Sequence, residues 1–554
     1  MTTNLVQTQH RPQSPGRGSR RAPTAPDWKA FYRNGLPKEV IVIEDSPDVS
    51  NSTTVPPSFP VPSTVPSQSN LCTKKRKLRC QNSLHATLTP QDRLPRLSAA
   101  SNDHNDSDLP PSSKRRRTQR NERSHGHGEN YVTKAYRLSQ DYHPPRGRTG
   151  RVKTATIRQV NCDLGPDNES IADDADGHLI VVPDQVIARR YPADRIEKLL
   201  GQGTFGKVVQ AYDSVNRERV ALKVIRSIQK YRDAARIELR VLQTLQHHDP
   251  ANMYRCIHSK DCFEYKGHIC ITMRLLGSSI FDFLKNNGFV PFPNSQIQSI
   301  AHQLLTSVAY MHDIHIIHTD LKPENILLRN ASYQAFTYNR KIPSATSKIS
   351  RTATQRKVLL NTEICVIDFG SATFEDEYHS SVVSTRHYRA PEIILGLEWS
   401  YPCDIWSVGC ILVELFTGDA LFQTHDNREH LAMMEAVCAS KIDASLARKA
   451  NSKSKSSNGD TSCYFKRLKL DYPVAETTRS SRAFVRAIRK LPDFIPPTNN
   501  FLMQFLDLLQ KMLVFEPGHR ITAKQALAHP WFSQQSHDDG TEAARLWAGK
   551  APQE

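Results

Sequence analysis

Three closely spaced glycines, Gly201, Gly203 and Gly206, are followed by a sequence typical of a β-strand rather than a helix. Glycines at such positions let main-chain amides approach phosphate groups, because no side chain blocks the way. In a dinucleotide-binding fold these glycines would open a long helix. Here Lys207 to Tyr212 continue as a strand, so the pattern favours a strand–turn–strand cover over phosphates and argues against the dinucleotide-binding fold.

A short apolar strand follows and ends in Lys223. A lysine in that setting can reach phosphates as a point charge, provided that an acid holds it in place. The segment from Lys230 to Leu245 has apolar residues at helical spacing and carries Glu238. Glu238 could be an ordinary surface carboxylate, but its position after the lysine strand favours an ion pair with Lys223.

The most informative run extends from His318 to Leu328 and reads HTDLKPENILL. Asp368-Phe369-Gly370 and Ala390-Pro391-Glu392 follow it. Phosphoryl transfer needs a carboxylate to accept the hydroxyl proton, a second carboxylate and an amide for Mg²⁺, and cations to neutralise the developing charge. These segments supply all of them, in order.

With these motifs together, the sequence resembles the eukaryotic protein kinases across residues 190–532. The resemblance implies an α+β, bilobal fold with a small β-rich N-lobe and a large helical C-lobe, and ATP and Mg²⁺ as cofactors. It also assigns catalytic roles. Asp320 is the catalytic base, Lys322 contacts the γ-phosphate, Lys223 and Glu238 form the ion pair between lobes, and Asn325 with Asp368 holds Mg²⁺.

By the same resemblance, Met273 is the gatekeeper residue and Leu275 offers main-chain groups to adenine. Arg274 stands in the hinge where relatives usually have Glu. Glu392 and Arg520 are expected to pair, and the run that starts at Asp404 is expected to form the buried central helix of the C-lobe. The residues expected to bind ATP are Leu200, Gly201, Gln202, Gly203, Thr204, Phe205, Gly206, Lys207, Val208, Ala221, Lys223, Met273, Leu275 and Asn325.

Two features narrow the resemblance to the LAMMER (Clk-type) dual-specificity kinases, within the cyclin-dependent-kinase-like group. Glu429 to Glu435 reads EHLAMME, and the activation segment reads FGSATF and later STRHYR. The sequence departs from the family motif at Ala436, where the family has Arg. The simpler interpretation of the EHLAMME run is a packed helix whose position 436 is exposed and varies freely.

The Arg that usually precedes the catalytic aspartate is replaced by Thr319. In kinases that carry it, this Arg pairs with an activation-loop phosphate. We therefore expect basal activity that needs no upstream kinase. The resemblance implies autophosphorylation on Ser, Thr and Tyr and phosphorylation of Arg/Ser-rich splicing factors; Lys322 with Thr385 is typical of Ser/Thr chemistry, and Glu324 could meet a substrate arginine.

Composition separates a long N-terminal arm from the rest of the chain. Half of the 34 prolines fall in the first 150 residues, a stretch poor in apolar runs, so residues 1–165 are predicted to be a disordered, basic, Ser/Pro-rich regulatory arm. Residues 533–554 are predicted to be a C-terminal tail. The net charge of +18 lies mostly in the arm and in two stretches around 329–357 and 448–469. Two insertions, at 330–360 and 448–462, are expected to be surface excursions. The resemblance to Clk-type kinases implies that the first is a hairpin.

The arm carries short signals. Basic runs from Lys74 to Arg79 and from Lys114 to Arg117 predict an import receptor as partner, and hence the nucleus, with the cytoplasm as a second location. Val40 to Ile43, followed by acids, resembles a SUMO-interacting motif; the alternatives are a chance apolar patch or a strand that packs on the folded domain. Ser14 and Ser46, each before a proline, are candidate phosphorylation sites.

Other features exclude whole classes. The 11 cysteines include no C-x-x-C pair, which disfavours a disulfide framework or a zinc site. No apolar stretch is long enough for a membrane span, and a monomer is expected.

Two alternatives to an active kinase of splicing factors remain: a nuclear pseudokinase scaffold, and a related dual-specificity kinase with other substrates. The intact set of Lys223, Asp320, Asn325 and Asp368 argues against the scaffold.

Overall fold

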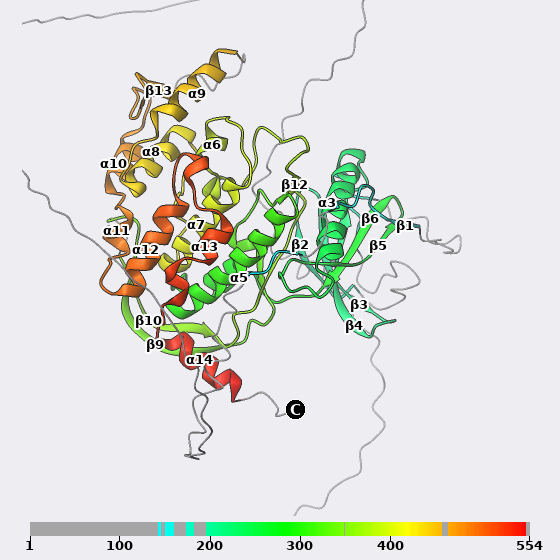
Figure 1. Cartoon of the computed structure of the whole chain (residues 1–554). Coiled ribbons are helices and arrows are strands. Elements are labelled where there is room, and N and C mark those ends of the chain that lie inside the picture. The colour runs from blue at the N-terminus through cyan, green and yellow to red at the C-terminus, as the bar shows by residue number, and fades with distance from the viewer. Residues whose placement is uncertain are drawn as a thin grey trace, which may run out of the picture. The chain divides into compact units, whose positions relative to one another are not determined.

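The computed structural model describes residues 142–145, 150–159, 173–181, 196–347, 350–456 and 464–549, without the side chains of 454–456. The import signals, the SUMO-type motif, Ser14 and Ser46 lie outside these ranges. None of the helices in the described part of the chain is both long and apolar enough to cross a membrane. The predicted bilobal α+β fold is confirmed, with a β-sheet lobe joined to a helical lobe (Figure 1).

The N-lobe is a six-stranded sheet in the order β1-β5-β6-β4-β3-β2. All neighbours are antiparallel except β1 and β5. The strands are β1 (Arg158–Gln159), β2 (Lys198–Gln202), β3 (Gly206–Asp213), β4 (Glu218–Ile225), β5 (Ser259–Tyr265) and β6 (His268–Arg274). Helix α3 (Gln229–His248) connects β4 to β5 and buries Glu238, Leu239, Leu242 and Leu245.

The register of β3 against β4 determines which side chains face the catalytic side. Val208 lies opposite Lys223, and Lys207 lies opposite Val224. Because side chains alternate between the two faces of a strand, Val208 and Lys223 share one face, and Lys207 and Val224 share the other. On that second face, Val224 belongs to a buried cluster with Leu179.

The C-lobe surrounds α7 (Pro402–Thr417), an almost entirely buried helix, as expected for the run that starts at Asp404. The helices around it are α4 (Ile280–Asn286), α5 (Asn294–Asp313), α6 (Pro391–Ile394), α8 (Asn427–Cys438), α9 (Ala444–Ser456), α10 (Arg479–Ala487), α11 (Leu491–Phe494), α12 (Asn500–Met512), α13 (Ala523–Leu527) and α14 (Asp539–Ala548). The 448–462 insertion therefore begins inside helix α9, and residues 457–463 lie outside the described ranges.

Short two-stranded sheets position the catalytic segments. They pair β7 (Ile316–Ile317) with β12 (Thr373–Phe374), β8 (Ile326–Leu328) with β11 (Ile364–Val366), and β13 (Phe465–Lys466) with β14 (Lys469–Leu470). The 330–360 insertion forms the predicted hairpin, β9 (Tyr333–Ile342) with β10 (Arg351–Leu359).

Both ends of the domain extend further than the sequence predicted. Residues 150–159, within the arm predicted to be disordered, hydrogen-bond to α3 and add β1 to the sheet. Residues 173–181 pack Leu179 and Val181 into the N-lobe core. At the other end, the predicted tail contains α14, which buries Ala543 against Val358 and Leu360 of the hairpin region (Figure 1). The sequence missed these contacts because they join residues far apart in the chain.

Candidate active site

Lys223 and Glu238 form the predicted ion pair. The Lys223 Nζ lies 2.6 Å from Glu238 Oε1 and 3.3 Å from Asp368 Oδ1, and Lys223 and Glu238 are both buried. Burial alone would lower the pKa of Lys223, but the two carboxylates outweigh it and raise that pKa. The lysine is therefore a fixed cation at the junction of the lobes, with α3 held inward.

Asp320 lies at the centre of a short hydrogen-bond network. Lys322 Nζ is 2.6 Å from Asp320 Oδ2, and the Thr385 hydroxyl donates to Asp320 Oδ1 at 2.6 Å. The Lys322 Nζ also lies 3.0 Å from Thr385 Oγ1. The structure thus brings together the predicted base, the predicted γ-phosphate lysine and the activation-segment threonine, and it fixes the orientation of the carboxylate.

Asp404 orients the catalytic loop, a role that the sequence did not reveal. Its carboxylate is buried and accepts main-chain hydrogen bonds from His318 (3.0 Å) and Thr319 (2.9 Å). The His318 ring packs against Phe369 with centroids 5.1 Å apart. The aspartate at the start of α7 therefore holds both residues that precede Asp320. The sequence did not predict this contact because Asp404 and the catalytic loop lie far apart in the chain.

Hydrogen bonds between hydroxyl groups and main-chain oxygens also tie the activation segment to the catalytic loop. The Ser384 hydroxyl donates to the main-chain oxygen of Thr319, and the Thr319 hydroxyl donates to the oxygen of Ser371 at 2.9 Å. The Arg389 guanidinium donates to the main-chain oxygen of Ser384 at 2.7 Å. We call this set the Ser384 latch.

Asn325 and Asp368 suit the magnesium role. The Asn325 amide nitrogen donates to the Asp320 main-chain oxygen at 2.9 Å, which orients its amide oxygen as a ligand. Burial would raise the pKa of Asp368, but the charges of Lys223 and Lys322 lower it, so its carboxylate is ionised. Oxygen donors of this kind are those that Mg²⁺ prefers, with phosphates and water completing its shell. Among the described residues, no cluster of three or more His, Cys, Asp or Glu could hold a metal by itself.

The glycine-rich segment forms the predicted strand–turn–strand, from β2 to β3, but one predicted ATP-binding side chain points elsewhere. The Gly203 amide donates to the Gly206 oxygen at 2.9 Å, and a Cβ on Gly206 would lie 2.2 Å from the Val224 oxygen. Lys207, predicted to bind ATP, instead places its ammonium 3.2 Å from Asp174 and 3.1 Å from the Leu179 oxygen. Its side chain lies on the face opposite Val208, so only its main chain remains for the nucleotide.

The predicted adenine region lies at the end of β6. Met273 pairs with Ala221 across the sheet, and Leu275 follows in the hinge as a half-buried residue. The Gly277 amide donates to the Leu328 oxygen at 2.8 Å, and a Cβ there would lie 2.9 Å from that oxygen. The hinge is thereby fixed to the strand that follows Asn325. Arg274 is exposed at its edge.

Glu324 is a carboxylate without a full set of partners. Its Oε2 atom is buried and has no hydrogen-bond partner among the described residues, although the residue as a whole is half-buried. Burial raises the pKa of Glu324. An acceptor left without a donor beside Asp320 would gain from a cation supplied by a substrate.

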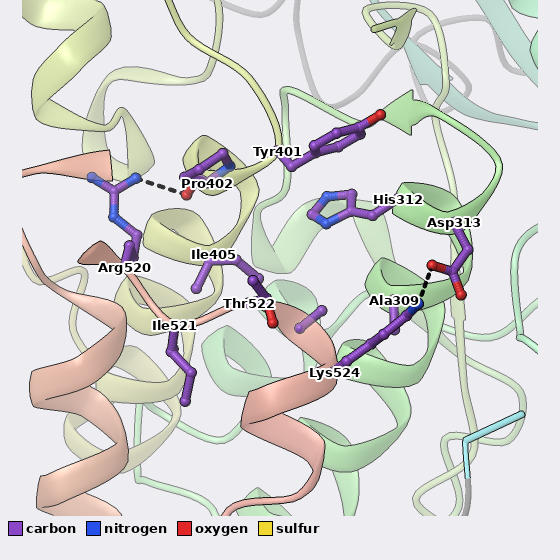
Figure 2. Close-up of a pocket in the computed structure, with 11 residues that line it drawn as sticks. Ala309, His312, Asp313, Tyr401, Pro402, Ile405, Arg520, Ile521, Thr522 and Lys524 are labelled. Atoms are coloured by element: carbon purple, nitrogen blue, oxygen red, sulfur yellow. Dashed lines mark hydrogen bonds and ion pairs between the residues drawn. The ribbon is translucent and has the colours of Figure 1, made fainter. Parts of the chain in front are cut away.

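The pair of Glu392 and Arg520 is confirmed, with two hydrogen bonds of 2.8 and 2.9 Å in a fully buried setting. Arg520 also borders a hollow of about 240 Å³ on the C-lobe, shown in Figure 2. The figure shows Lys524 paired with Asp313 at the rim, at 2.5 Å, and Arg520 bonded to the Pro402 oxygen. This hollow contains none of the residues predicted to bind ATP and is separate from the active site.

The EHLAMME run forms the middle of α8 and is mostly core, as its simpler interpretation held. His430 to Met434 are buried. The two acids act locally, because Glu429 accepts a hydrogen bond from Ser481 on α10 and Glu435 lies 2.7 Å from Lys441. Ala436 is half-buried rather than exposed, so an arginine there would have to extend from a partly covered position.

The lysine–glutamate pair, the aspartate network and the inward Phe369 define the catalytic centre of a protein kinase. The family model described as "Protein kinase domain" matches residues 195–532. A crystal structure described as a kinase domain is 32% identical with a TM-score of 0.56, and the match covers 64% of this chain and 99% of that chain.

Three relatives define the group more closely. "Dual specificity protein kinase lkh1" of Schizosaccharomyces pombe is 47% identical over 71% of this chain and 55% of its own length. "Serine/threonine-protein kinase AFC2" of Arabidopsis thaliana is 44% identical (66% and 81%), and "Dual specificity protein kinase CLK2" of Homo sapiens is 44% identical (66% and 68%). The chain belongs to the protein kinase family, in its LAMMER (Clk-type) dual-specificity group. The match spans little more than half of the fission yeast relative.

Proposed function

We propose that this protein is an active, ATP- and Mg²⁺-dependent kinase of Arg/Ser-rich nuclear proteins such as splicing factors, with autophosphorylation on Ser, Thr and Tyr. The network around Asp320 carries the proposal for activity. Its base, its lysine and its aligned threonine are within hydrogen-bond distance of one another, and Lys223, Glu238 and Asp368 are assembled beside it.

In this mechanism the Asp320 carboxylate orients the acceptor hydroxyl and takes its proton as the oxygen attacks the γ-phosphorus. The bond to the β-phosphate oxygen breaks, and ADP leaves. Lys322 neutralises charge on the transferred group, and Lys223 holds the α- and β-phosphates. Asn325 and Asp368 would hold Mg²⁺, which when bound would offset the charge of the phosphates. The Gly203–Gly206 turn covers them with main-chain amides and excludes water.

Glu324 supports the proposed substrate class. An arginine next to the acceptor serine could place a guanidinium on this underpartnered carboxylate and form charge-assisted hydrogen bonds. Lysine would supply charge without the planar fork. A substrate with many Arg/Ser repeats places an arginine next to a serine at many positions along its chain.

The remaining partners are proposed from the sequence of the arm. The basic runs at 74–79 and 114–117 favour an import receptor and the nucleus, and Val40 to Ile43 favours a SUMO-modified partner. The names of the relatives support the kinase chemistry but do not bear on these partners.

Phosphate transfer from labelled ATP by the purified full-length chain tests the proposal. The substrates are an Arg/Ser repeat peptide, a Lys/Ser peptide of equal charge and an acidic peptide. We expect labelling of the chain itself and of the Arg/Ser peptide, loss of both in Asp320→Asn, and unchanged activity in Asp233→Asn, which alters an exposed carboxylate on α3. Equal labelling of the Lys/Ser peptide would refute arginine recognition, and activity retained in Asp320→Asn would refute the assignment of the base.

A further inference from the structure

Residues 142–145 and 150–159, here called the strap, contact both lobes although they precede the kinase domain. At the C-lobe end, the Tyr142 hydroxyl donates to Asp313 Oδ2 at 2.8 Å, and its ring packs edge-on against Tyr254, with centroids 5.7 Å apart. Tyr254 stacks on Tyr310 of α5 and donates its own hydroxyl to the His143 oxygen at 2.7 Å. Tyr142 is thus anchored on the helix that ends at the rim of the hollow in Figure 2.

The strap then follows α3. The His248 ring lies 2.9 Å from the Gly150 oxygen, and the Val152 amide donates to the Thr244 hydroxyl at 3.1 Å. Gln243 exchanges two hydrogen bonds with the main chain of Thr156, at 3.1 and 3.2 Å. Each of these α3 residues lies C-terminal to Glu238 on the same helix. A contact that fixes this half of α3 therefore constrains the position of Glu238.

Arg151 joins the strap to the beginning of the activation segment. Its guanidinium lies 2.5 Å from Asp376 and 3.3 Å from Glu377. Arg240 of α3 reaches the same Glu377 carboxylate at 2.6 Å. Both guanidinium groups lie 5.4 Å from the centroid of the Phe374 ring, which is almost fully buried. Glu377 is thus shared by an arginine from the strap and an arginine from α3.

This cluster lies next to the catalytic residues in the chain. Phe374 is in β12, which pairs with β7 immediately before His318, and Arg240 is two residues beyond Glu238. The catalytic loop itself offers Thr319 where other kinases have an arginine. Beside Lys322, which bonds to Thr385, arginines from α3 and from the strap hold the activation segment to the rest of the domain.

We propose that Arg151 is a positioning residue for phosphoryl transfer: anchored by Tyr142 on the C-lobe, the strap clamps α3 and the start of the activation segment in the arrangement that the Lys223–Glu238 pair requires. The proposal rests on the kinase activity proposed above. It goes beyond that activity because it gives part of the N-terminal arm a catalytic consequence and predicts that residues 195–532 alone form an incomplete enzyme.

The test compares full-length variants in steady-state kinetics and hydrogen exchange. Arg151→Ala should lower kcat by about 3- to 30-fold, the range of coupling through such contacts, and speed exchange in the C-terminal half of α3 and at 371–377. Tyr142→Phe removes one hydrogen bond and should shift both readouts in the same direction by a smaller factor. Lys153→Ala is the matched control, since Lys153 is an exposed strap lysine with no ion pair to any described residue.

A double-mutant cycle then separates positioning from a general loss of stability. If Arg151 acts through Asp376 and Glu377, adding Arg151→Ala to a variant that carries both Asp376→Asn and Glu377→Gln should lower kcat by much less than it does in the wild type. Unchanged kcat and exchange in Arg151→Ala, equal losses in Lys153→Ala, or fully additive effects would each overturn the proposal. If Arg151→Ala does not fold, Tyr142→Phe decides by the same two readouts. A wild type without phosphate transfer would refute the proposed function, and the exchange measurement would still test the strap.

Discussion

The hydroxyl of Ser384 donates a hydrogen bond to the main-chain oxygen of Thr319, and so joins the end of the activation segment to the residue before the catalytic base. Both residues have positive φ angles, 68° and 67°, which side-chain-bearing residues seldom adopt. Each therefore depends on its surroundings to hold its backbone. The contact needs no phosphate, which agrees with the expectation, drawn from Thr319, of activity without an upstream kinase.

Ser384→Ala removes the side chain of the latch. We expect kcat to fall by about 3- to 10-fold, the effect of one uncharged hydrogen bond that orients a reacting segment, while Ser381→Ala, an exposed neighbour, has no effect. Phosphatase treatment of the wild type before the assay should leave kcat unchanged. Inactivation by the phosphatase would show that a phosphate, and not the latch, orders this segment.

Glu238→Gln leaves the buried Lys223 without its principal counter-charge. Because breaking one side of a buried ion pair is strongly unfavourable, we expect kcat/KM for ATP to fall by about 100-fold or more. The control is Glu218→Gln. Glu218 lies in the same strand as Lys223, and its carboxylate forms a solvent-accessible ion pair with Lys260, at 2.5 Å. An equal loss in the two variants would argue against a specific role for the pair.

Glu324→Gln tests arginine recognition without changing the size of the side chain. We expect KM for the Arg/Ser peptide to rise by about 10-fold or more, the worth of a charged hydrogen bond, with little change for a serine peptide that lacks arginine. Burial raises the pKa of Glu324, so its charge is lost at a higher pH than for an ordinary glutamate. Acidification should therefore weaken binding of the Arg/Ser peptide to the wild type but not to Glu324→Gln.

Glu414 makes the stability of the C-lobe dependent on pH. Burial raises its pKa to about 8, and Tyr388 donates a hydrogen bond to it at 2.7 Å. Since folding favours the protonated form, this stabilisation is complete below the ordinary value of 4.5 and is lost as the pH rises through about 8. The urea concentration at which the protein unfolds should vary less between pH 4.5 and pH 8 for Glu414→Gln than for the wild type. At pH 9, the free energy of unfolding of Glu414→Gln should exceed that of the wild type by about 1 kcal/mol or more. An unchanged pH profile would contradict the assignment.

Asp538→Ala should loosen the attachment of α14. Asp538 caps this helix by accepting from Gly540 at 3.0 Å, and it also accepts the main-chain hydrogen bond of Ser295 at 3.0 Å, at the start of α5. Loss of a cap of this type lowers the free energy of unfolding by about 1–2 kcal/mol. Thermal unfolding monitors the change, with Glu542→Gln, at an exposed residue of the same helix, as a variant that keeps the cap. Identical melting temperatures for Asp538→Ala and the wild type would exclude the role.

The catalytic residues could be predicted from the sequence because each lies in a short segment whose local order is distinctive. Lys223, Asp320, Asn325 and Asp368 all come together as expected. The resemblance to protein kinases, and to their Clk-type group, also implied the buried α7 and the 330–360 hairpin. What the patterns could not supply is the direction of a particular side chain. Lys207 is the example, since strand alternation turned it towards Asp174.

The contacts that sequence reasoning missed join distant parts of the chain. Arg151 meets Asp376, and Asp404 meets the main chain of Thr319. Neither contact leaves a periodic signal, because each depends on how complete elements pack. The average composition of the N-terminal arm also gave no indication of the strap. A few anchoring side chains suffice to order a segment that, averaged over the arm, has too little apolar surface to fold by itself.

The position of α14 also affects the order in which the protein is completed during synthesis. It is the last described helix, and Ala543 packs on the apolar side chains of Val358 and Leu360, which precede it in the chain by almost two hundred residues. A ribosome that has finished the catalytic residues still holds a nascent chain in which these apolar side chains are bare, and exposed apolar surface promotes association with other chains. A transcript with an early stop codon near residue 535 would thus direct the synthesis of a polypeptide with every catalytic motif and a persistent tendency to aggregate.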